Sequence, residues 1–146
     1  MIRVIEAQHD LATTIAPTHH CPLTFSATGI LFASYEDPGR INAAIERELE
    51  QNRNSGRLNA PKDRATLAEL ITETRDRGFS IINDGGGDGF GAISAPVFDV
   101  AGRLQMALTV FGRTGRVDTS PDSSLARLVL KSARSISAEF GHRHSG

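Results

Sequence analysis

The chain has 146 residues, one cysteine and a formal net charge of −1 at pH 7. This length suits a single domain with its own core, one cysteine excludes an internal disulfide, and the balanced charge argues against nonspecific binding to a nucleic-acid backbone. Apolar runs stop well short of the roughly 18 residues that a membrane helix needs, and the first residues lack the apolar core of a signal peptide, so we expect a cytoplasmic protein without a membrane partner.

The first part of the chain is predicted to hold two short strands and then two helices. The strands are RVIEA (residues 3–7) and LATTIA (residues 11–16). Ser26 or Thr28 can cap a short helix in the segment SATGILFAS. Asp37 and the proline after it suit the cap and first turn of a second helix. The apolar residues of that helix recur at helical spacing at Ile41, Ala44, Ile45 and Leu49.

Two further helices are predicted on either side of a hairpin. A polar loop, NRNSGRLN (residues 52–59), precedes the first of them, and Gly78 suits its left-handed C-terminal cap. The second starts in TSPDSS, with Ser120 as its cap, and ends before Gly141. Their apolar stripes are Leu67, Leu70, Ile71 and Thr74 in the former, and Leu125, Leu128, Val129, Ile136 and Phe140 in the latter.

The segment GAISAPVFDVAGRLQMALTVFG (residues 91–112) is predicted to form an antiparallel hairpin. Its turn lies between Asp99 and Gly102, a pair in which the Asp side chain caps the backbone and Gly adopts a conformation that other residues resist. Pairing Phe98 with Arg103 sets the register of the two strands.

This register places Ala92 opposite Thr109, and strand alternation divides the side chains between two faces. One face, predicted to pack on the helices, carries Ile93, Ala95, Val97, Leu104, Met106, Leu108 and Val110. The other carries Ala92, Ser94, Ala107, Thr109 and Phe111. Strands, helices, a hairpin and a closing helix together predict an α+β fold, with an antiparallel sheet packed against helices.

The second face of the hairpin has an unusual composition for a sheet. A solvated face typically carries Lys, Glu, Arg or Gln, and a core face carries larger aliphatic residues. Small groups with two hydroxyls and one aromatic ring suit the lining of a small concave binding site. A weakly exposed face that a loop covers fits the pattern equally well.

The same hairpin carries a resemblance to a known family. AISAPVFDVAGRLQMALTVFGRTGR resembles the effector-binding domain of IclR-type transcriptional regulators. Three further segments, CPLTFSATGILFAS, LITETRDRGFSI and SLARLVLKSARSISAEFG, resemble other parts of that domain in the same order. The resemblance extends over roughly residues 3–141, so it is far more specific than one short motif.

The resemblance implies a GAF-like α+β domain with a curved antiparallel sheet. It also implies that residues 1–146 form a single ligand-sensing domain, N-terminally truncated relative to the family, whose partners are a small organic acid and further copies in a dimer or tetramer. DNA would be contacted only through a winged helix-turn-helix domain that this sequence does not contain. No cofactor, metal or catalytic residue is implied, and we expect no enzymatic activity.

The resemblance also implies a ligand site between the start of the first helix and the hairpin sheet. Phe111 replaces a small hydroxyl residue of the family pattern, which favours an aromatic carboxylate as the effector. Hydroxyls and the N–H groups of a helix start are suitable partners for a carboxylate. The implied ligand-binding residues are Ser26, Ala27, Thr28, Gly29, Asp84, Ala92, Ser94, Thr109 and Phe111.

Several other features can be interpreted either as a functional site or as an ordinary loop, tail or solvated charge. HHC (residues 19–21) suits a thiol nucleophile or two metal ligands, but a loop is favoured because no third partner is identifiable. HRH (residues 142–144) is typical of a solvated tail, and GGGDG (residues 85–89) lacks the Lys and Ser/Thr of a phosphate-binding loop. Arg113 and Arg116 suit an anion or plain solvation.

Two functions remain open from the sequence. The first is the ligand-sensing domain described above. The alternative is a stand-alone dimerisation or interaction module whose pocket has decayed. A homo-oligomer is expected in either case, because an uncovered sheet edge near residues 3–16 favours pairing with another copy.

Overall fold

A computed structural model describes residues 21–83 and 89–142 of the chain. Its three strands form one antiparallel sheet in the order β1-β2-β3. The elements are α1 (Ala27–Tyr35), α2 (Pro38–Asn54), α3 (Arg64–Arg77), β1 (Ser80–Asn83), β2 (Phe90–Phe98), β3 (Leu104–Arg113) and α4 (Ser124–Glu139). The fold is therefore α+β, as predicted. The strands expected at residues 3–7 and 11–16 lie outside the described residues.

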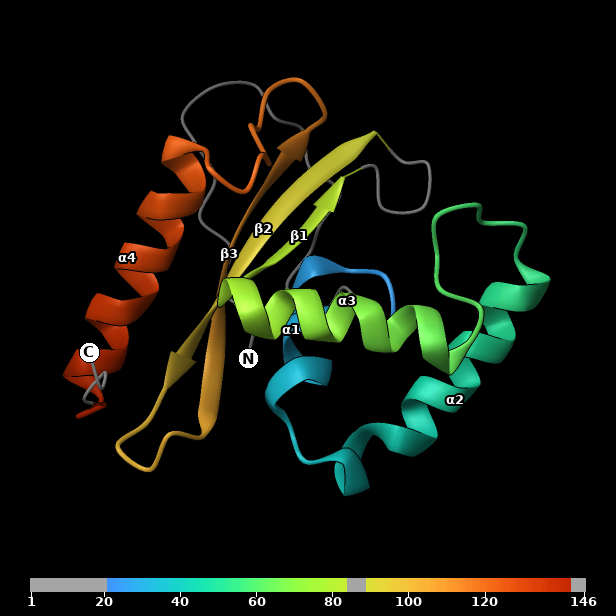
Figure 1. Ribbon diagram of the computed structural model, residues 1–146, viewed down its shortest axis with the longest axis horizontal. Helices are drawn as coiled ribbons and strands as arrows, with labels where there is room; N and C mark the ends of the chain where they lie inside the picture. Colours follow the sequence, from blue (N-terminus) through green and yellow to red (C-terminus); the bar gives the residue numbers. More distant parts are fainter. Residues whose placement is uncertain (1–20, 84–88, 143–146) are drawn as a thin grey trace.

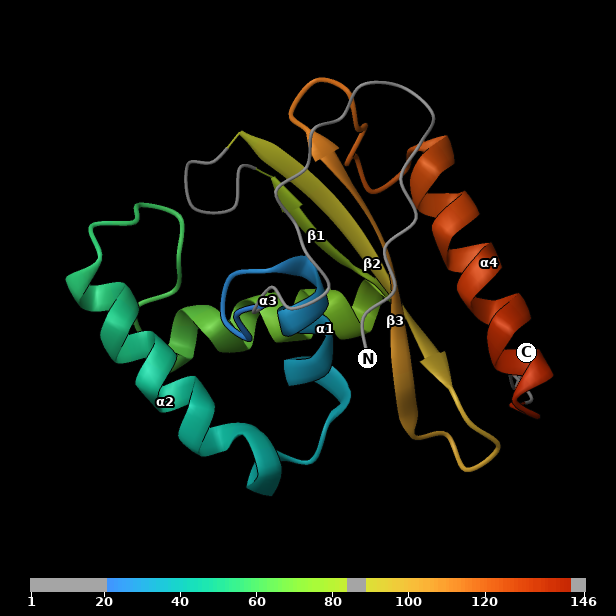
Figure 2. The same ribbon diagram turned by 180° about the vertical axis from the view of Figure 1, so that it is seen from behind.

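The sheet separates α4 from the other helices. α4 packs on β2 and β3, while α1 crosses the opposite face of all three strands (Figure 1). α3 packs against α1 and β1, and α2 lies farthest from the sheet (Figure 2). A second apolar cluster, formed by Ala33, Ile45, Leu49 and Leu67, joins α1, α2 and α3. The sheet therefore lies between α4 on one side and the packed helices α1, α2 and α3 on the other.

Most of the apolar face of the hairpin packs on α4, as the alternation predicts, but Met106 is 42% exposed and neither it nor Leu104 joins this cluster. Ile93, Ala95 and Val97 are fully buried there. The stripe predicted for α4 is partly wrong, because Leu128 and Phe140 are 59% and 46% exposed. The buried residues of α4 are Ala126, Val129, Ala133 and Ser137. Ala126, Ala133 and Ser137 are small and lie at the contact with the sheet, and Leu125, Leu130 and Ile136 pack against the same core while partly buried.

Local signals locate most helix ends, with two corrections. Ser26, Asp37 and Gly78 cap their helices as predicted. α4 begins one turn later than expected, because its cap is Ser123, whose hydroxyl accepts the Ala126 N–H at 3.0 Å. Residues 52–54, predicted as loop, continue α2 because the amide of Asn52 is buried and finds partners; it donates to Thr24 Oγ1 and to the Pro61 carbonyl.

The predicted register of the hairpin is wrong by two residues. Ala92 pairs with Phe111 rather than with Thr109, whose partner is Ser94. The turn begins one residue later than expected, since the Asp99 N–H donates to the Arg103 carbonyl at 2.9 Å. A bulge beside Val97 adds the second residue. Because two is an even shift, the side chains from Val97 away from the turn stay on their predicted faces. Leu104 does not, because it pairs with Phe98 on the turn side of the bulge.

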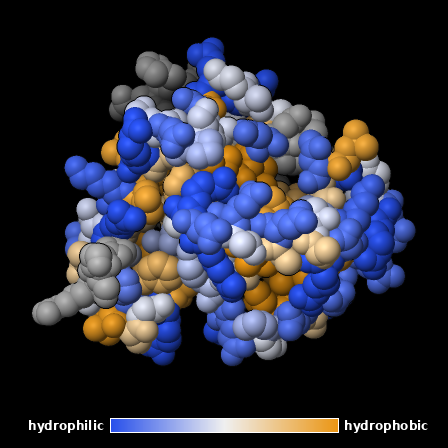
Figure 3. Space-filling view, viewed as in Figure 1, coloured by the Kyte–Doolittle hydropathy of each residue, from blue (hydrophilic) through white to orange (hydrophobic). Residues whose placement is uncertain are grey.

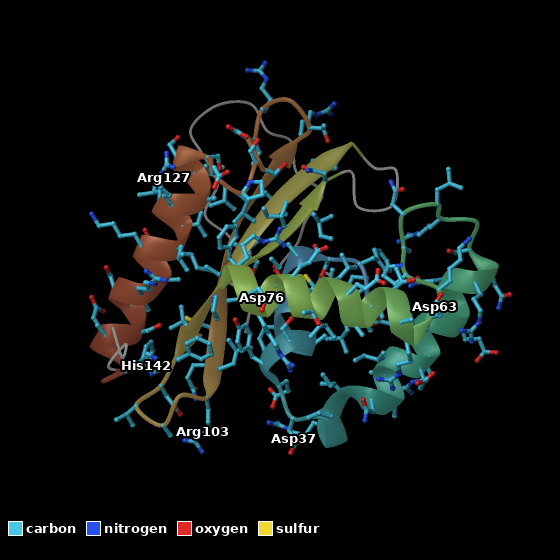
Figure 4. The ribbon with its side chains drawn as sticks, in the orientation of Figure 1. Asp37, Asp63, Asp76, Arg103, Arg127 and His142 are labelled. Carbon is cyan, nitrogen blue, oxygen red and sulfur yellow. The ribbon has the colours of Figure 1, made fainter. Side chains whose placement is uncertain are left out.

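The carboxylate of Asp99 organises the hairpin turn. It accepts hydrogen bonds from the backbone N–H of Ala101 and Arg103 and from the side chains of Arg103 and Gln105, at 2.8–3.0 Å. The His142 ring bonds the Asp99 carbonyl at 3.0 Å, which joins the end of α4 to the turn, where Figure 4 shows Arg103 and His142. The Arg103 backbone hydrogen bond is the main cause that holds the pKa of Asp99 below its ordinary value.

Gly29 marks the closest approach of α1 to the preceding chain. A Cβ at this position would lie 1.9 Å from the Pro22 carbonyl oxygen, so even one methyl group cannot fit without a backbone shift. The residue is buried and its backbone is helical, so the requirement is space rather than backbone conformation. This tight crossing fixes how the first turn of α1 lies on the sheet.

Gly29→Ala tests this crossing. Alanine normally stabilises a helix interior by roughly 0.5–1 kcal/mol relative to glycine. Here the variant is expected to lose at least about 2 kcal/mol of unfolding free energy, because the added methyl group forces the two backbones apart. Urea unfolding measures the change. Gly39→Ala is the matched control, since its Cβ would touch only the flexible Asp37 carboxylate; equal effects in both variants would contradict the tight crossing.

Asp99→Asn tests the turn by its pH dependence. Because the folded pKa of Asp99 is lowered, its ionised form stabilises the fold above the unfolded pKa of about 3.9. That stability is lost as pH falls through the lower folded pKa. The variant is therefore expected to be less stable than the parent at pH 7 and to approach it near pH 3, measured by urea unfolding. Asp122→Asn is the control, and a deficit for Asp99→Asn that does not change with pH would contradict this role.

Candidate functional site

A row of hydroxyls crosses the sheet beneath α1. The register aligns Ser80, Ser94 and Thr109 side by side on β1, β2 and β3. Ser94 Oγ lies 2.7 Å from Thr109 Oγ1, which lies 2.8 Å from Thr28 Oγ1 on α1. Ser80 Oγ donates to the Ala27 carbonyl at 2.5 Å. We call Thr28, Ser80, Ser94 and Thr109 the hydroxyl cluster; it joins the first turn of α1 to every strand.

The start of α1 adds backbone donors to this cluster. Ser26 caps the helix, accepting the Gly29 N–H at 2.9 Å and donating to the Pro22 carbonyl at 2.8 Å. In the described part of the chain, no acceptor takes the N–H groups of Ala27 and Thr28. The N-terminus of a helix carries partial positive charge, so these two donors favour an anion.

One hydroxyl proton of the cluster has no acceptor among the described residues. Thr28, Ser94 and Thr109 carry one hydroxyl proton each, and the two hydrogen bonds among them use two of the three. No other acceptor for these protons lies within hydrogen-bond distance among the described residues. Within the described part of the chain, one O–H therefore has no acceptor, beside the N–H groups of Ala27 and Thr28.

An apolar row borders the hydroxyls on the same face of the sheet. Ile82, Ala92 and Phe111 pair across the three strands, one step along from Ser94 and Thr109. All three are partly buried. The arrangement thus sets polar donors next to an apolar surface with one aromatic ring. That combination suits a ligand with a carboxylate at one end and an apolar body at the other.

The structure brings most of the predicted site residues together. Thr28, Ser94 and Thr109 are in direct contact, and Phe111 lies on the same sheet face. Three others have mainly backbone or packing roles: Ser26 caps α1, Ala27 accepts from Ser80, and Gly29 packs on Pro22. Asp84 lies outside the described residues, so its role stays a prediction.

Two polar residues that hold the start of α1, Ser80 and Thr24, were not predicted from the sequence. Ser80 lies on β1, a short strand whose pairing with β2 cannot be inferred from the hairpin alone. Thr24 is completely buried, and both its N–H and its hydroxyl donate to Glu48 Oε2 at 3.0 Å. Asn52 completes this polar brace, which we define as Thr24, Glu48 and Asn52. Through it, α2 holds the segment just before α1.

Other candidate features receive less support from the structure. Desolvation by the surrounding protein raises the pKa of the Cys21 thiol, which lowers the population of the nucleophilic thiolate. Within residues 21–83 and 89–142, no group of three His, Cys, Asp or Glu side chains could hold a metal ion. No helix in those ranges is long and apolar enough to cross a membrane. Arg113 and Arg116 are exposed, and His19 and His20 lie outside the described residues.

Comparison with known proteins identifies the family. Residues 1–138 match the family described as bacterial transcriptional regulator IclR C-terminal. The HTH-type transcriptional regulator BhcR of Paracoccus denitrificans (strain Pd 1222) is 33% identical over 75 residues, which cover 51% of this chain and 27% of that protein. The DNA-binding transcriptional repressor YiaJ of Escherichia coli (strain K12) is 25% identical over 128 residues, covering 84% of this chain and 43% of the repressor.

Solved structures share the fold. Pseudomonas aeruginosa HmgR superposes with a TM-score of 0.83 at 28% identity, over 97% of this chain and 54% of that one. Thermotoga maritima IclR gives a TM-score of 0.76 at 14% identity, over 94% of this chain and 55% of that one. The chain spans less than half the length of either curated relative. Since the family match covers 1–138 of 146 residues, the protein belongs to the IclR family of bacterial transcriptional regulators and corresponds to their C-terminal, effector-binding domain.

Proposed function

We propose that this domain binds a small carboxylate effector between the first turn of α1 and the sheet, and thereby controls DNA binding by another domain of the same regulator. The observation that carries the proposal is a pair of N–H groups, on Ala27 and Thr28, that have no acceptor among residues 21–83 and 89–142, beside a hydroxyl cluster with one proton that has no acceptor in the same ranges. A carboxylate would accept from both kinds of donor. Phe111 would lie against the body of the acid, which favours an aromatic or apolar one.

Three contacts support a route from this site to the rest of the domain. Ser80 ties the Ala27 carbonyl to β1, Thr109 ties Thr28 to β3, and the polar brace ties the preceding segment to α2. A ligand oxygen that competes for the Thr28 hydroxyl would alter how α1 lies on the sheet. An effector shifts a conformational equilibrium only by its difference in affinity for the two states, and contacts that change with the position of α1 supply such a difference.

One observation favours the alternative, a dimerisation or interaction module whose pocket no longer binds a ligand. Thr28 and Thr109 contact each other directly at 2.8 Å, so the helix and the sheet leave no gap at that point. If these hydroxyls serve only packing, removing one changes stability and nothing else. The two functions therefore differ in what happens when carboxylates are added.

Thermal unfolding with a panel of small and aromatic carboxylates tests the proposal. A true effector at about 100 times its Kd is expected to add roughly 2.7 kcal/mol of stability. Thr109→Val is expected to lose most of that gain, because it removes the central hydroxyl of the cluster. Thr72→Val, the same change on the exposed face of α3, is expected to keep it. Neutral amides of the same acids control for charge. If no carboxylate raises the melting temperature of the parent protein, the alternative module is supported instead.

Phe111→Ser tests the specificity of the site. The parent is expected to prefer aromatic acids, and the variant to bind them more weakly and to bind two- or three-carbon oxoacids better. Offset ring contacts contribute on the order of 1 kcal/mol, so the change for an aromatic acid should be about fivefold in Kd. Calorimetric titration of both proteins measures it. An unchanged order of preference together with a large fall in melting temperature would show that Phe111 is a packing residue only.

A further inference from the structure

Arg57 lies over the ring of Phe25, next to the start of α1. Its guanidinium carbon is 4.6 Å from the centre of the ring, a distance at which a cation is attracted to the ring face. Phe25 directly precedes Ser26, the cap of α1, and is two residues before Ala27. Two residues of chain span at most about 7 Å. The contact therefore holds a positive charge close to the N–H donors of the proposed effector site.

Arg57 differs from every other arginine in residues 21–83 and 89–142. It is partly buried, its side-chain N–H groups donate to no residue of those ranges, and no carboxylate there pairs with it. Most of the other arginines donate to a carbonyl or carboxylate oxygen. The remainder, Arg47, Arg113, Arg116 and Arg134, are exposed to solvent. Arg57 thus keeps a full set of donors where water reaches it only in part.

The loop between α2 and α3 is anchored beside the segment that carries Phe25. The Asn52 amide donates to the Pro61 carbonyl at 2.8 Å and to Thr24 Oγ1 at 2.9 Å. One buried side chain therefore joins the loop of Arg57 to the residue just before Phe25. The position of the guanidinium over the ring follows from this anchoring as well as from the attraction between the two groups.

A guanidinium stacked on a ring keeps its edge available for a carboxylate. Its planar fork of N–H groups can bind both carboxylate oxygens at once, and the ring limits the orientations of the fork. The apolar row of the site crosses the sheet from Phe111 on β3 to Ile82 on β1, and the loop after α2 lies on the β1 side of the sheet (Figure 1). An acid whose body follows this row would extend toward the side where Arg57 lies.

We propose that the effector is a dicarboxylate and that Arg57 binds its second carboxylate. The inference rests on the proposed effector site, where the N–H groups of Ala27 and Thr28 would bind the first carboxylate. A monoacid would leave the partly buried guanidinium without an anion, whereas a diacid would satisfy both ends of the site. Arg57 is therefore a specificity-determining residue, which selects the ligand by its charge, while Phe111 selects it by its apolar body.

Calorimetric titration with matched acids tests the role of Arg57. The diacids are isophthalate, terephthalate and adipate, and the monoacids are benzoate and hexanoate. At least one diacid is expected to bind the parent about tenfold more tightly than its monoacid, because it adds hydrogen bonds between charged groups. Arg57→Gln is expected to remove this difference and to leave the affinity for the monoacid unchanged. Arg57→Lys keeps the charge without the planar fork and is expected to retain part of the preference.

Arg47→Gln is the matched control and is expected to keep the preference for diacids. Arg47 is exposed and donates to no described residue, on the helix α2 where Figure 3 shows mostly hydrophilic residues. The monoamide of each diacid keeps its size without the second charge and is expected to bind like the monoacid. The ¹⁵Nε signal of Arg57, assigned by its loss in Arg57→Lys, is expected to move with diacids and to stay in place with monoacids.

Three outcomes would overturn the role of Arg57 alone: diacids that bind no more tightly than monoacids, a diacid preference that survives Arg57→Gln, or equal weakening of both kinds of acid in that variant. Equal weakening would show that Arg57 attracts anions in general. If no acid of either kind binds the parent protein, the proposed effector site is wrong, and this inference fails with it.

Discussion

The first turn of α1 lies so close to the Pro22 carbonyl that only glycine fits at position 29. Gly29 lets the Pro22 carbonyl pass over the helix, and the Ser80 hydroxyl holds the Ala27 carbonyl at 2.5 Å. These contacts leave the N–H groups of α1 beside the middle of the sheet rather than in open solvent. The site, the sheet row beneath it and the link to α2 all depend on this placement.

The polar groups around α1 form a connected system. The polar brace buries Glu48 at 8% exposure, and its carboxylate accepts two hydrogen bonds from Thr24. A buried carboxylate that lost these bonds would be costly, so the segment before α1 is held firmly to α2. The hydroxyl cluster is different, because its bonds join neutral groups that can exchange one partner for another at little cost. The polar brace, which is held firmly, and the hydroxyl cluster, which can exchange partners, both contact the start of α1 or the segment just before it.

Much of this arrangement could be predicted from local sequence. Ser26, Asp37 and Gly78 act within one helical turn of their own positions, and strand alternation predicted the faces of the hairpin correctly except near the bulge, at Leu104 and Met106. The register failed because a bulge and a shifted turn each added one residue, which alternation cannot detect. Ser80 and Thr24 were missed because their partners lie 53 and 24 residues away. Contacts over such separations depend on tertiary packing, which no local pattern encodes.

The central claim is that a carboxylate binds at the start of α1, and an NMR titration of the ¹⁵N-labelled protein tests it most directly. We expect the amide protons of Ala27 and Thr28 to move downfield as they gain an acceptor. Their movement should saturate at the ligand concentration that saturates the thermal shift. If a carboxylate stabilises the protein while these two amides stay unchanged and amides of α4 or the hairpin turn move, the effector binds elsewhere and the account of the α1 site is wrong.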